Sequence, residues 1–254
     1  MKKYLASIQV RLNSSRLPKK ALEKIGGFNS IEWMINRLQK SEKIDKIVVA
    51  TTNSNMDDAI EDLCKSLNVD CFRGSEDDVL NRISQMLKHY NYENHLEFYG
   101  DSPFPDPSMV DDFILKYEKT GKLFLSNTHK TTYPPGFEII IYKASELINL
   151  EENKDVANVN RSHCGVNLLN YLKDINPEGI ELIEAPKNRY FPELHFELDT
   201  EEDLEVLNAI VPIIQNKHGN FFSIDDALIS SQNNITIFSK NNDVQRRYEF
   251  FRKG

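Results

Sequence analysis

Short apolar runs alternate with amphipathic helical patterns over the first 120 residues, and this alternation restricts the fold more than any other feature of the sequence. Strands are expected at 4–10, 46–52, 69–72 and 95–100, and helices at 30–40, 57–67, 75–90 and 106–119. In the first helix Ile31, Met34, Ile35 and Leu38 repeat at the spacing of one helix face. This order predicts an α/β fold, with a mostly parallel sheet flanked by helices on both faces.

Three helix starts carry capping residues. Asp106 is expected as an N-cap, with a proline at the first helical position. Ser75 with Asp78, and Thr200 with Asp203, each form a capping-box pattern. The sequence therefore marks where these three helices begin.

The regular alternation of strand and helix patterns ends at about residue 120. Strands are expected at 122–127, 136–142, 180–185 and 194–198, and helices near 145–150, 158–172 and 200–214. We expect mixed strand pairing here, and a lobe over one end of the sheet. The polar and basic tail, 239–254, is expected to pack loosely or to contact a partner.

Composition excludes several classes of protein. The chain has 254 residues, 40% of them hydrophobic, which is enough for a folded core and too many for a disordered chain. A formal net charge of -8 argues against nonspecific nucleic-acid binding. No apolar run has the length that spans a bilayer, and we interpret the N-terminal segment MKKYLASIQV as a first strand rather than a signal peptide. Three scattered cysteines argue against a zinc site or a disulfide framework and fit a reducing cytoplasm.

A cation-rich segment, QVRLNSSRLPKKAL at 9–22, follows the first strand. It carries Arg11, Arg16, Lys19 and Lys20 and no carboxylate, although the whole chain is acidic. In open α/β sheets ligands bind outside the carboxyl ends of strands, and guanidinium and ammonium groups there suit phosphate. The segment has neither the P-loop spacing nor a G-x-G-x-x-G pattern. The simpler alternative is a solvated surface loop.

Two aspartates are placed to hold Mg²⁺ beside such phosphates. Asp101 follows the expected strand at 95–100, and Asp199 follows the one at 194–198. Mg²⁺ typically takes one or two carboxylates together with phosphate oxygens and water. Taken singly, Asp199 is equally an acid at a helix start, and Asp101 equally a turn residue.

Six motifs occur in an order typical of one enzyme family: VRLNSSRLPKKAL, VVATT, FRGSEDDVLNR, GDSPFPDP, TYPPGFEI and ELDTEEDL. From about residue 4 to 230 the chain resembles the cytidylyltransferases of surface-polysaccharide synthesis, of the spore-coat polysaccharide type. These are related to the enzymes that activate Kdo and sialic acids as CMP-sugars. The resemblance implies a fold like the GT-A glycosyltransferases, a homodimer, Mg²⁺ as cofactor, and attack of an acceptor oxygen on the α-phosphate of CTP with loss of pyrophosphate.

The resemblance also implies roles for individual residues. Arg11, Ser14, Arg16 and Lys20 would hold the triphosphate, and Asp101 and Asp199 would hold Mg²⁺. Of these, the catalytic residues would be Arg11, Arg16, Lys20 and Asp101. The base and ribose would be lined by Thr51, Thr52, Gly74, Ser75, Asp77, Asp78 and Arg82. For Arg82 a helix-surface charge is an equal alternative.

The acceptor side departs from the family pattern. Residues expected near the acceptor are Tyr133, Gly136, Glu138, Arg161 and His163. Asn160 and Ser162 stand where relatives often have acids, and Lys19 stands where they often have glycine. His129 and His195 are two further histidines that a fold of this kind brings within reach of the cleft, although a structural role is the simpler interpretation of each. The acceptor therefore stays open between an acidic sugar and a phosphate monoester.

The resemblance divides one domain, 1–254, into a nucleotide-binding part (1–120), an acceptor and dimerisation lobe (121–200), and C-terminal helices with a tail (201–254). Partners are expected to be CTP and a small sugar or phosphorylated acceptor, without nucleic acid or membrane. Two alternatives remain: a GT-A-like nucleotide-sugar glycosyltransferase, whose usual D-x-D triplet is not evident, and a non-catalytic nucleotide-binding scaffold.

Overall fold

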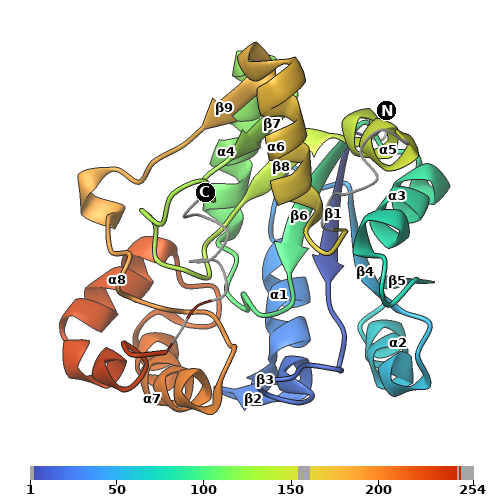
Figure 1. Cartoon of the computed structure of the whole chain (residues 1–254). Helices are drawn as coiled ribbons and strands as arrows, with labels where there is room; N and C mark the ends of the chain where they lie inside the picture. Colours follow the sequence, from blue (N-terminus) through green and yellow to red (C-terminus); the bar gives the residue numbers. More distant parts are fainter. Residues whose placement is uncertain (1–2, 154–160, 245, 247–254) are drawn as a thin grey trace.

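Within the residues that a computed structural model of the protein describes, 3–153, 161–244 and 246, seven strands form one sheet in the order β5-β4-β1-β6-β8-β7-β9 (Figure 1). Two further strands form a small hairpin, β2-β3. The strands are β1 (Tyr4–Gln9), β2 (Lys24–Ile25), β3 (Phe28–Asn29), β4 (Lys46–Thr52), β5 (Asp70–Gly74), β6 (Asn94–Tyr99), β7 (Phe124–Ser126), β8 (Ile140–Lys143) and β9 (Ile180–Leu182). All four strands predicted before residue 120 are confirmed.

Pairing is parallel in the first half of the sheet and mixed in the second. β1 lies between β4 and β6, parallel to both, and β4 is parallel to β5. β8 is antiparallel to β6 and to β7, whereas β7 and β9 are parallel. The predicted mostly parallel sheet with mixed pairing beyond residue 120 is therefore confirmed. The later strands extend the same sheet.

Helices cover both faces of the sheet. They are α1 (Ser30–Leu38), α2 (Asp58–Ser66), α3 (Val79–Tyr90), α4 (Pro107–Thr120), α5 (Ala144–Glu152), α6 (Cys164–Ile175), α7 (Glu201–His218) and α8 (Ile224–Gln232). Apolar residues of α1, α2, α4, α7 and α8 form one core cluster, and those of α3, α5 and α6 form the other. Alternate residues of β1 supply both clusters, since Ala6 belongs to the first and Leu5 to the second. Burial on both faces explains why these strands are continuously apolar.

Short 3-10 helices of one or two turns lie between or after the larger elements. They are η1 (Lys20–Leu22), η2 (Asn55–Asp57), η4 (Pro177–Gly179), η5 (Lys187–Arg189) and η6 (Ile235–Lys240). No described helix is both long and apolar enough to cross a membrane.

Two of the three expected helix caps are confirmed. The side chain of Asp106 accepts hydrogen bonds from the first turn of α4, and Thr200 with Asp203 forms the capping box of α7. The predicted start at Ser75 is wrong: α3 begins at Val79, and its N-cap is Asp78, which accepts from the backbone of Asn81 at 2.9 Å. The Ser75 hydroxyl instead accepts from the Asp78 backbone at 3.1 Å, which shapes the loop before the helix.

Two other predictions need correction. Residues 194–198 do not form a strand: the segment is extended, but its backbone bonds to two different loops, Phe196 N to Pro135 O and Leu198 N to Asp101 O, both at 2.8 Å. The helix expected at 158–172 begins later, at Cys164. Asn160, named in that prediction, lies outside the described residues, as do 247–254 of the predicted tail.

Candidate active site

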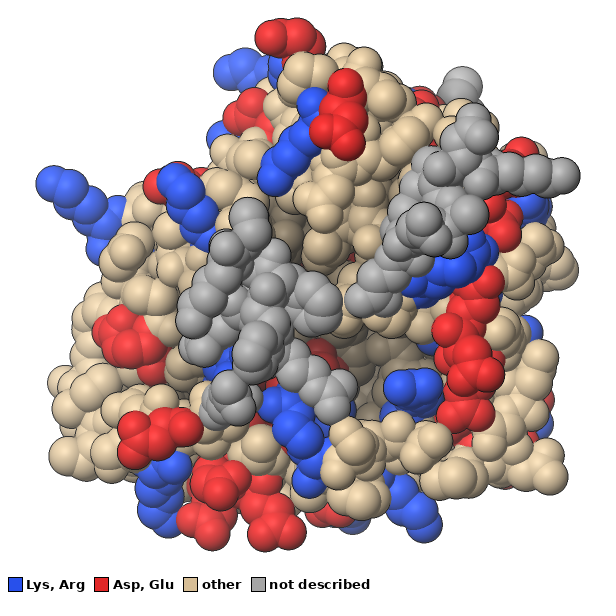
Figure 2. All heavy atoms as spheres, viewed as in Figure 1, with Lys and Arg blue, Asp and Glu red and all other residues tan. Residues whose placement is uncertain are grey.

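A cavity of about 310 Å³ opens at the carboxyl ends of β1 and β6. Figure 2 shows the face that carries it, hollowed near its centre with basic side chains close by. The cavity wall comes from the basic segment, from the ends of β6 and β7, from the segment before β8, from α6 and from residues 197–199. The lining residues are Ser14, Arg16, Lys20, Tyr99, Asp101, Ser102, Thr128, His129, Glu138, Ile140, His163, Val166, Leu169, Asn170, Lys173, Glu197 and Asp199.

The basic segment folds back on itself, which separates its cations. The backbone N–H groups of Ser14 and Lys19 both donate to Leu12 O, at 2.8 and 3.0 Å. Lys19 adopts a left-handed backbone conformation (φ 58°) and its side chain is exposed, whereas Arg16 and Lys20 turn inward. A glycine adopts that conformation without strain, which gives a physical reason for glycine at this position in relatives.

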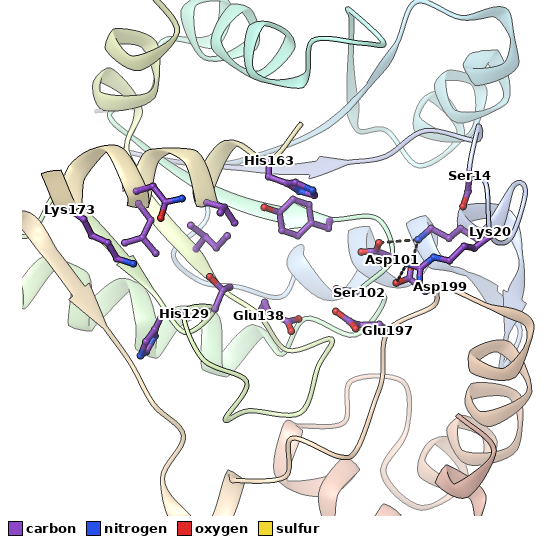
Figure 3. A pocket seen from close by; sticks show the side chains of 17 residues that line it. Ser14, Lys20, Asp101, Ser102, His129, Glu138, His163, Lys173, Glu197 and Asp199 are labelled. Atoms are coloured by element: carbon purple, nitrogen blue, oxygen red, sulfur yellow. Dashed lines mark hydrogen bonds and ion pairs between the residues drawn. The ribbon is translucent and has the colours of Figure 1, made fainter. Parts of the chain in front are cut away.

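Four charged groups meet at one end of the cavity (Figure 3). Lys20 Nζ donates to Asp101 Oδ2 at 2.9 Å and to Asp199 Oδ1 at 2.6 Å. Arg16 Nη2 donates to Asp199 Oδ2 at 2.5 Å. The side chains of Lys20 and Asp199 are each only 14% exposed, and that of Asp101 is 33% exposed. Two cations and two carboxylates therefore form a compact, partly buried cluster.

The charges in this cluster stabilise one another against burial. Burial alone would raise the pKa of Asp199, but the Lys20 ammonium and the Arg16 guanidinium outweigh it and hold that pKa below its usual value. Burial would likewise lower the pKa of Lys20, but Asp101 and Asp199 raise it. Asp199 and Lys20 are therefore both charged at neutral pH.

Backbone hydrogen bonds bring the two aspartates together although 98 positions separate them in the sequence. Gly100 N donates to Gln9 O at 2.9 Å, so the residue before Asp101 is bonded to the end of β1. Leu198 N donates to Asp101 O at 2.8 Å, and Asp199 N donates to the buried Asp203 carboxylate at 3.0 Å. The start of α7 thus fixes Asp199 beside Asp101.

The same cluster shows where a divalent cation fits. One carboxylate oxygen from each of Asp101 and Asp199 contacts the single nitrogen of Lys20, so both oxygens converge on one point. No cluster of three or more His, Cys, Asp and Glu side chains suited to a metal occurs among the described residues, so the protein would supply two carboxylates. Two carboxylates with phosphate oxygens and water form an ordinary Mg²⁺ site.

The predicted base-lining threonines hold the structure of the site. Thr51 and Thr52 are fully buried, and both hydroxyls donate to Asp57 Oδ2, at 2.9 and 2.5 Å. The other oxygen of Asp57 accepts from Leu12 N at 2.9 Å. Asp57, which the sequence reasoning missed, therefore ties the end of β4 to the start of the basic segment.

The loop between β5 and α3 contacts the outer part of the basic segment. Arg11 lies 3.9 Å from Glu76, and Asn13 donates to the same carboxylate oxygen at 3.1 Å. Asp77 is exposed on this loop. The loop and the outer part of the basic segment thus form one border of the site, with the Arg11 side chain 48% exposed.

Arg82 holds this loop in shape. Its guanidinium donates to Ser75 O at 2.5 Å, and a Cβ at Gly74 would lie 2.7 Å from its side chain. Arg82 is buried, so the alternative of a helix-surface charge is wrong. Burial lowers its pKa.

The predicted acceptor residues divide into two groups. Glu138 and His163 line the cavity. Tyr133 is buried against Phe113, and Gly136 (φ 105°) packs so closely on Phe196 that a Cβ would lie 2.8 Å from its carbonyl carbon.

Arg161 belongs to the second group. Its Nε donates to Asp78 at 2.7 Å and its Nη2 to Glu151 at 3.3 Å, so it joins the start of α3 to α5. The structure thus brings together about half of the residues predicted for the acceptor, and the others support the loops around them.

Two cavity residues that the sequence reasoning missed had a detectable signal. Glu197 precedes Asp199 by two positions, and alternate residues of an extended segment point to the same side. Lys173 lies in α6, three positions after Asn170 and seven after Val166, a spacing that places these three cavity residues on one face of the helix.

The sequence model of a family described as cytidylyltransferase matches residues 5–163. Over 253 residues the chain is 26% identical to the spore coat polysaccharide biosynthesis protein SpsF of Bacillus subtilis, covering 98% of this chain and 99% of that protein. A solved cytidylyltransferase from Leptospira borgpetersenii has a TM-score of 0.80 and 27% identity, covering 97% of this chain and 100% of that one.

Other relatives match over a shorter region. An uncharacterised protein of Methanocaldococcus jannaschii is 41% identical over 117 residues, 45% of this chain and 48% of that protein. A 3-deoxy-manno-octulosonate cytidylyltransferase of Leptospira interrogans is 29% identical over 112 residues, 44% of each chain. The chain thus spans about half the length of these two proteins, whereas the SpsF match runs end to end.

Proposed function

The chain belongs to the cytidylyltransferase family, and from this premise we propose that it transfers CMP from CTP to a sugar or sugar-like acceptor, with release of pyrophosphate, for surface glycan synthesis. The observation that carries the proposal is the meeting of Arg16 and Lys20 with Asp101 and Asp199 at one end of a cavity. The end-to-end match to a spore coat polysaccharide protein supports the surface-glycan role.

In the proposed reaction an acceptor oxygen forms a bond to the α-phosphorus of CTP. The bond from that phosphorus to the bridging oxygen breaks, and pyrophosphate leaves with the electron pair. An acceptor hydroxyl gives its proton to water, whereas a phosphate acceptor attacks as the dianion and has no proton to lose. Phosphoryl-type transfer asks the protein mainly for positioning and for neutralisation of charge, which Arg16 and Lys20 are placed to give.

Asp101 and Asp199 would hold Mg²⁺, since one oxygen of each already converges on a single cation. When bound, Mg²⁺ polarises the α-phosphate and neutralises charge on the leaving group. The ammonium group of Lys20 would then turn from the carboxylates to the triphosphate, and Arg16 would follow. Arg11, half-exposed at the border of the site, would meet the outer phosphates.

We also propose that the enzyme works in the cytoplasm, where the three scattered cysteines would stay reduced, and that it is a homodimer, as the resemblance implies. Light scattering on the purified protein in solution tests the second statement, because a dimer has twice the 29.4 kDa mass of the chain.

Thermal unfolding with CTP, UTP, GTP or ATP, each with and without Mg²⁺, tests the nucleotide. A ligand that binds only the folded protein stabilises it by about 2.7 kcal/mol at a hundred times its dissociation constant. We expect a rise in Tm with CTP and Mg²⁺ that is lost in Asp101→Asn and in Asp199→Asn. A rise with another nucleotide alone would overturn the choice of CTP.

Pyrophosphate release with a panel of sugar acids and sugar phosphates then tests the transfer. Release that depends on both CTP and an acceptor is the expected result. Transfer of a sugar from a nucleotide-sugar donor would favour a glycosyltransferase, and nucleotide binding without any turnover would favour a scaffold.

A further inference from the structure

One side of α6 lines the cavity along its length. Val166, Asn170 and Lys173 follow one another at intervals of four and three residues, which places them on one face of the helix, and the N-cap residue His163 lines the cavity just before it. In Figure 3 this face leads from His163 to Lys173, and Lys173 lies with His129 at the opposite end from the two aspartates. The cavity therefore has two ends with cationic groups, well separated from each other.

The far end carries positive charge that the described residues do not balance. Glu184 is the acid nearest to it: its Oε1 lies 3.7 Å from His129 Nε2 and 2.5 Å from Lys130 Nζ. Lys173 forms no ion pair with any residue that the structure describes. Lys130 is thus paired with Glu184, whereas Lys173, whose side chain is exposed, has no such partner among the described residues.

His129 presents a buried polar atom to this end. Its Nδ1 is shielded from solvent and has no hydrogen-bond partner within the described part of the chain. Burial lowers the pKa of His129, Glu184 raises it, and Lys130 and Lys173 lower it further, so Lys173 is close enough to affect the imidazole. An anion beside Lys173 would offset the lysine charge, and a turn of the imidazole ring would bring its unpartnered Nδ1 to that anion.

The middle of the cavity is lined by acidic side chains instead. Glu138 and Glu197 face it from one side (Figure 3). Burial raises the pKa of Glu197, and the nearby charge of Glu138 raises it further, which shows that negative charge is unfavourable there. Carboxyl groups in such a place accept hydrogen bonds from hydroxyls, and Val166 and Leu169 offer an apolar wall.

These observations leave one place for an anionic group of the acceptor. The middle repels it, and the cations of the near end are assigned to the triphosphate. We propose that Lys173 and His129 form an oxyanion subsite, which binds a carboxylate or phosphate of a polyhydroxylated acceptor at the end remote from its attacking oxygen. The proposal rests on the proposed function, which assigns the near end to CTP.

Binding of inorganic phosphate or acetate to the full chain tests the subsite without knowledge of the acceptor. Saturating CTP and Mg²⁺ block the near end, and the dissociation constant of each anion comes from thermal unfolding at rising concentration. The variants are Lys173→Met, Lys173→Arg and His129→Gln. Lys116→Met is the matched control, because Lys116 is a half-exposed lysine of α4 that pairs with Glu181 at 3.4 Å, away from the cavity.

We expect phosphate or acetate to bind the wild type, and Lys173→Met to weaken binding about tenfold or more, as for loss of a charge-assisted hydrogen bond. Lys173→Arg should retain most of the affinity, His129→Gln should lose part of it, and the control should be unchanged. Tighter binding of phosphate than of acetate would identify a phosphorylated acceptor, and the reverse a sugar acid. Equal affinity in wild type and Lys173→Met, or no anion binding to the wild type, would overturn the proposal.

The same titrations separate this proposal from the one it rests on. If CTP with Mg²⁺ gives no rise in Tm but phosphate binding still depends on Lys173, the subsite stands and the nucleotide assignment fails. If CTP binds normally and phosphate does not, the reverse holds. Once an acceptor is found, Lys173→Met should raise its KM about tenfold or more, with kcat and the KM of CTP unchanged.

Discussion

Replacing Lys20 by methionine removes the ammonium group that joins Asp101 to Asp199. The methionine keeps most of the apolar stem, so the change is mainly one of charge. Two carboxylates then share one end of the cavity with Arg16, which pairs with Asp199. We expect a less stable protein, and one that gains stability from Mg²⁺ without any nucleotide.

The structure gives the size of the loss. Removing one partner of a buried ion pair costs about 3–5 kcal/mol. Asp101 is 33% exposed and Asp199 keeps Arg16, so the lower limit, about 3 kcal/mol, applies here. In a chain of this length that corresponds to a fall in Tm of roughly 6–12 °C.

Thermal unfolding followed by circular dichroism, with and without Mg²⁺ and without nucleotide, checks this prediction. Lys19→Met is the control, since the neighbouring lysine is exposed, and its Tm should change little. Mg²⁺ should raise the Tm of Lys20→Met more than that of the wild type or of Lys19→Met, because a divalent cation can bind both free carboxylates. The reasoning fails if Lys20→Met is as stable as Lys19→Met, or if Mg²⁺ raises the Tm of the wild type by the same amount.

Three further predictions concern the support of the site. Asp57→Ala leaves two buried N–H groups and two buried hydroxyls without an acceptor, so urea unfolding should show a loss of about 3 kcal/mol. Nucleotide binding should weaken, because the basic segment loses its anchor. A urea midpoint equal to that of the wild type would contradict this. Burial lowers the pKa of the fully buried His95 from an ordinary 6.5 to about 3. Between these two values the unfolded chain binds a proton that the folded protein excludes. The free energy of unfolding should therefore fall by about 1.4 kcal/mol per pH unit as the pH falls from about 6 to 4. His95→Asn should flatten that slope in urea titrations, whereas the exposed His89→Asn should leave it as it is. Gly136→Ala should cost about 2–3 kcal/mol in the same assay, since its φ is 105° and a Cβ meets Phe196, whereas Gly219→Ala, with φ 76° and open space around it, should cost only about 1 kcal/mol.

Regular elements with strong periodicity were predictable from the sequence. This holds for the buried strands β1 and β4 and for the helices α1 and α4. Their signals, the spacing of apolar residues and caps such as Asp106, act over a few positions of the chain. Prediction failed where a residue distant in the sequence determines the local structure. Residues 194–198 have the alternating pattern of a strand, but their hydrogen bonds go to Pro135 and Asp101 in loops.

The charged end of the site was also predictable. Arg16, Lys20, Asp101 and Asp199 were singled out by residue type and by their place after expected strands, and the structure brings all four into contact. The roles assigned to them stay predictions until binding is measured. The threonines of β4 show the limit of such reasoning, since only the fold reveals that Asp57 occupies their hydroxyls.

The sequence by itself determined which segments become strands and helices, and that four cations and two aspartates follow strand ends. These properties depend on the spacing of apolar residues and on local capping, which act over a few positions. Only the tertiary structure decided that Lys20 bridges Asp101 and Asp199, that Glu197 faces the middle of the cavity, and that Lys173 and His129 line the same cavity. Each of those contacts joins residues far apart in the chain, and their distance and burial, which set their electrostatic energy, exist only after the sheet and α6 have packed.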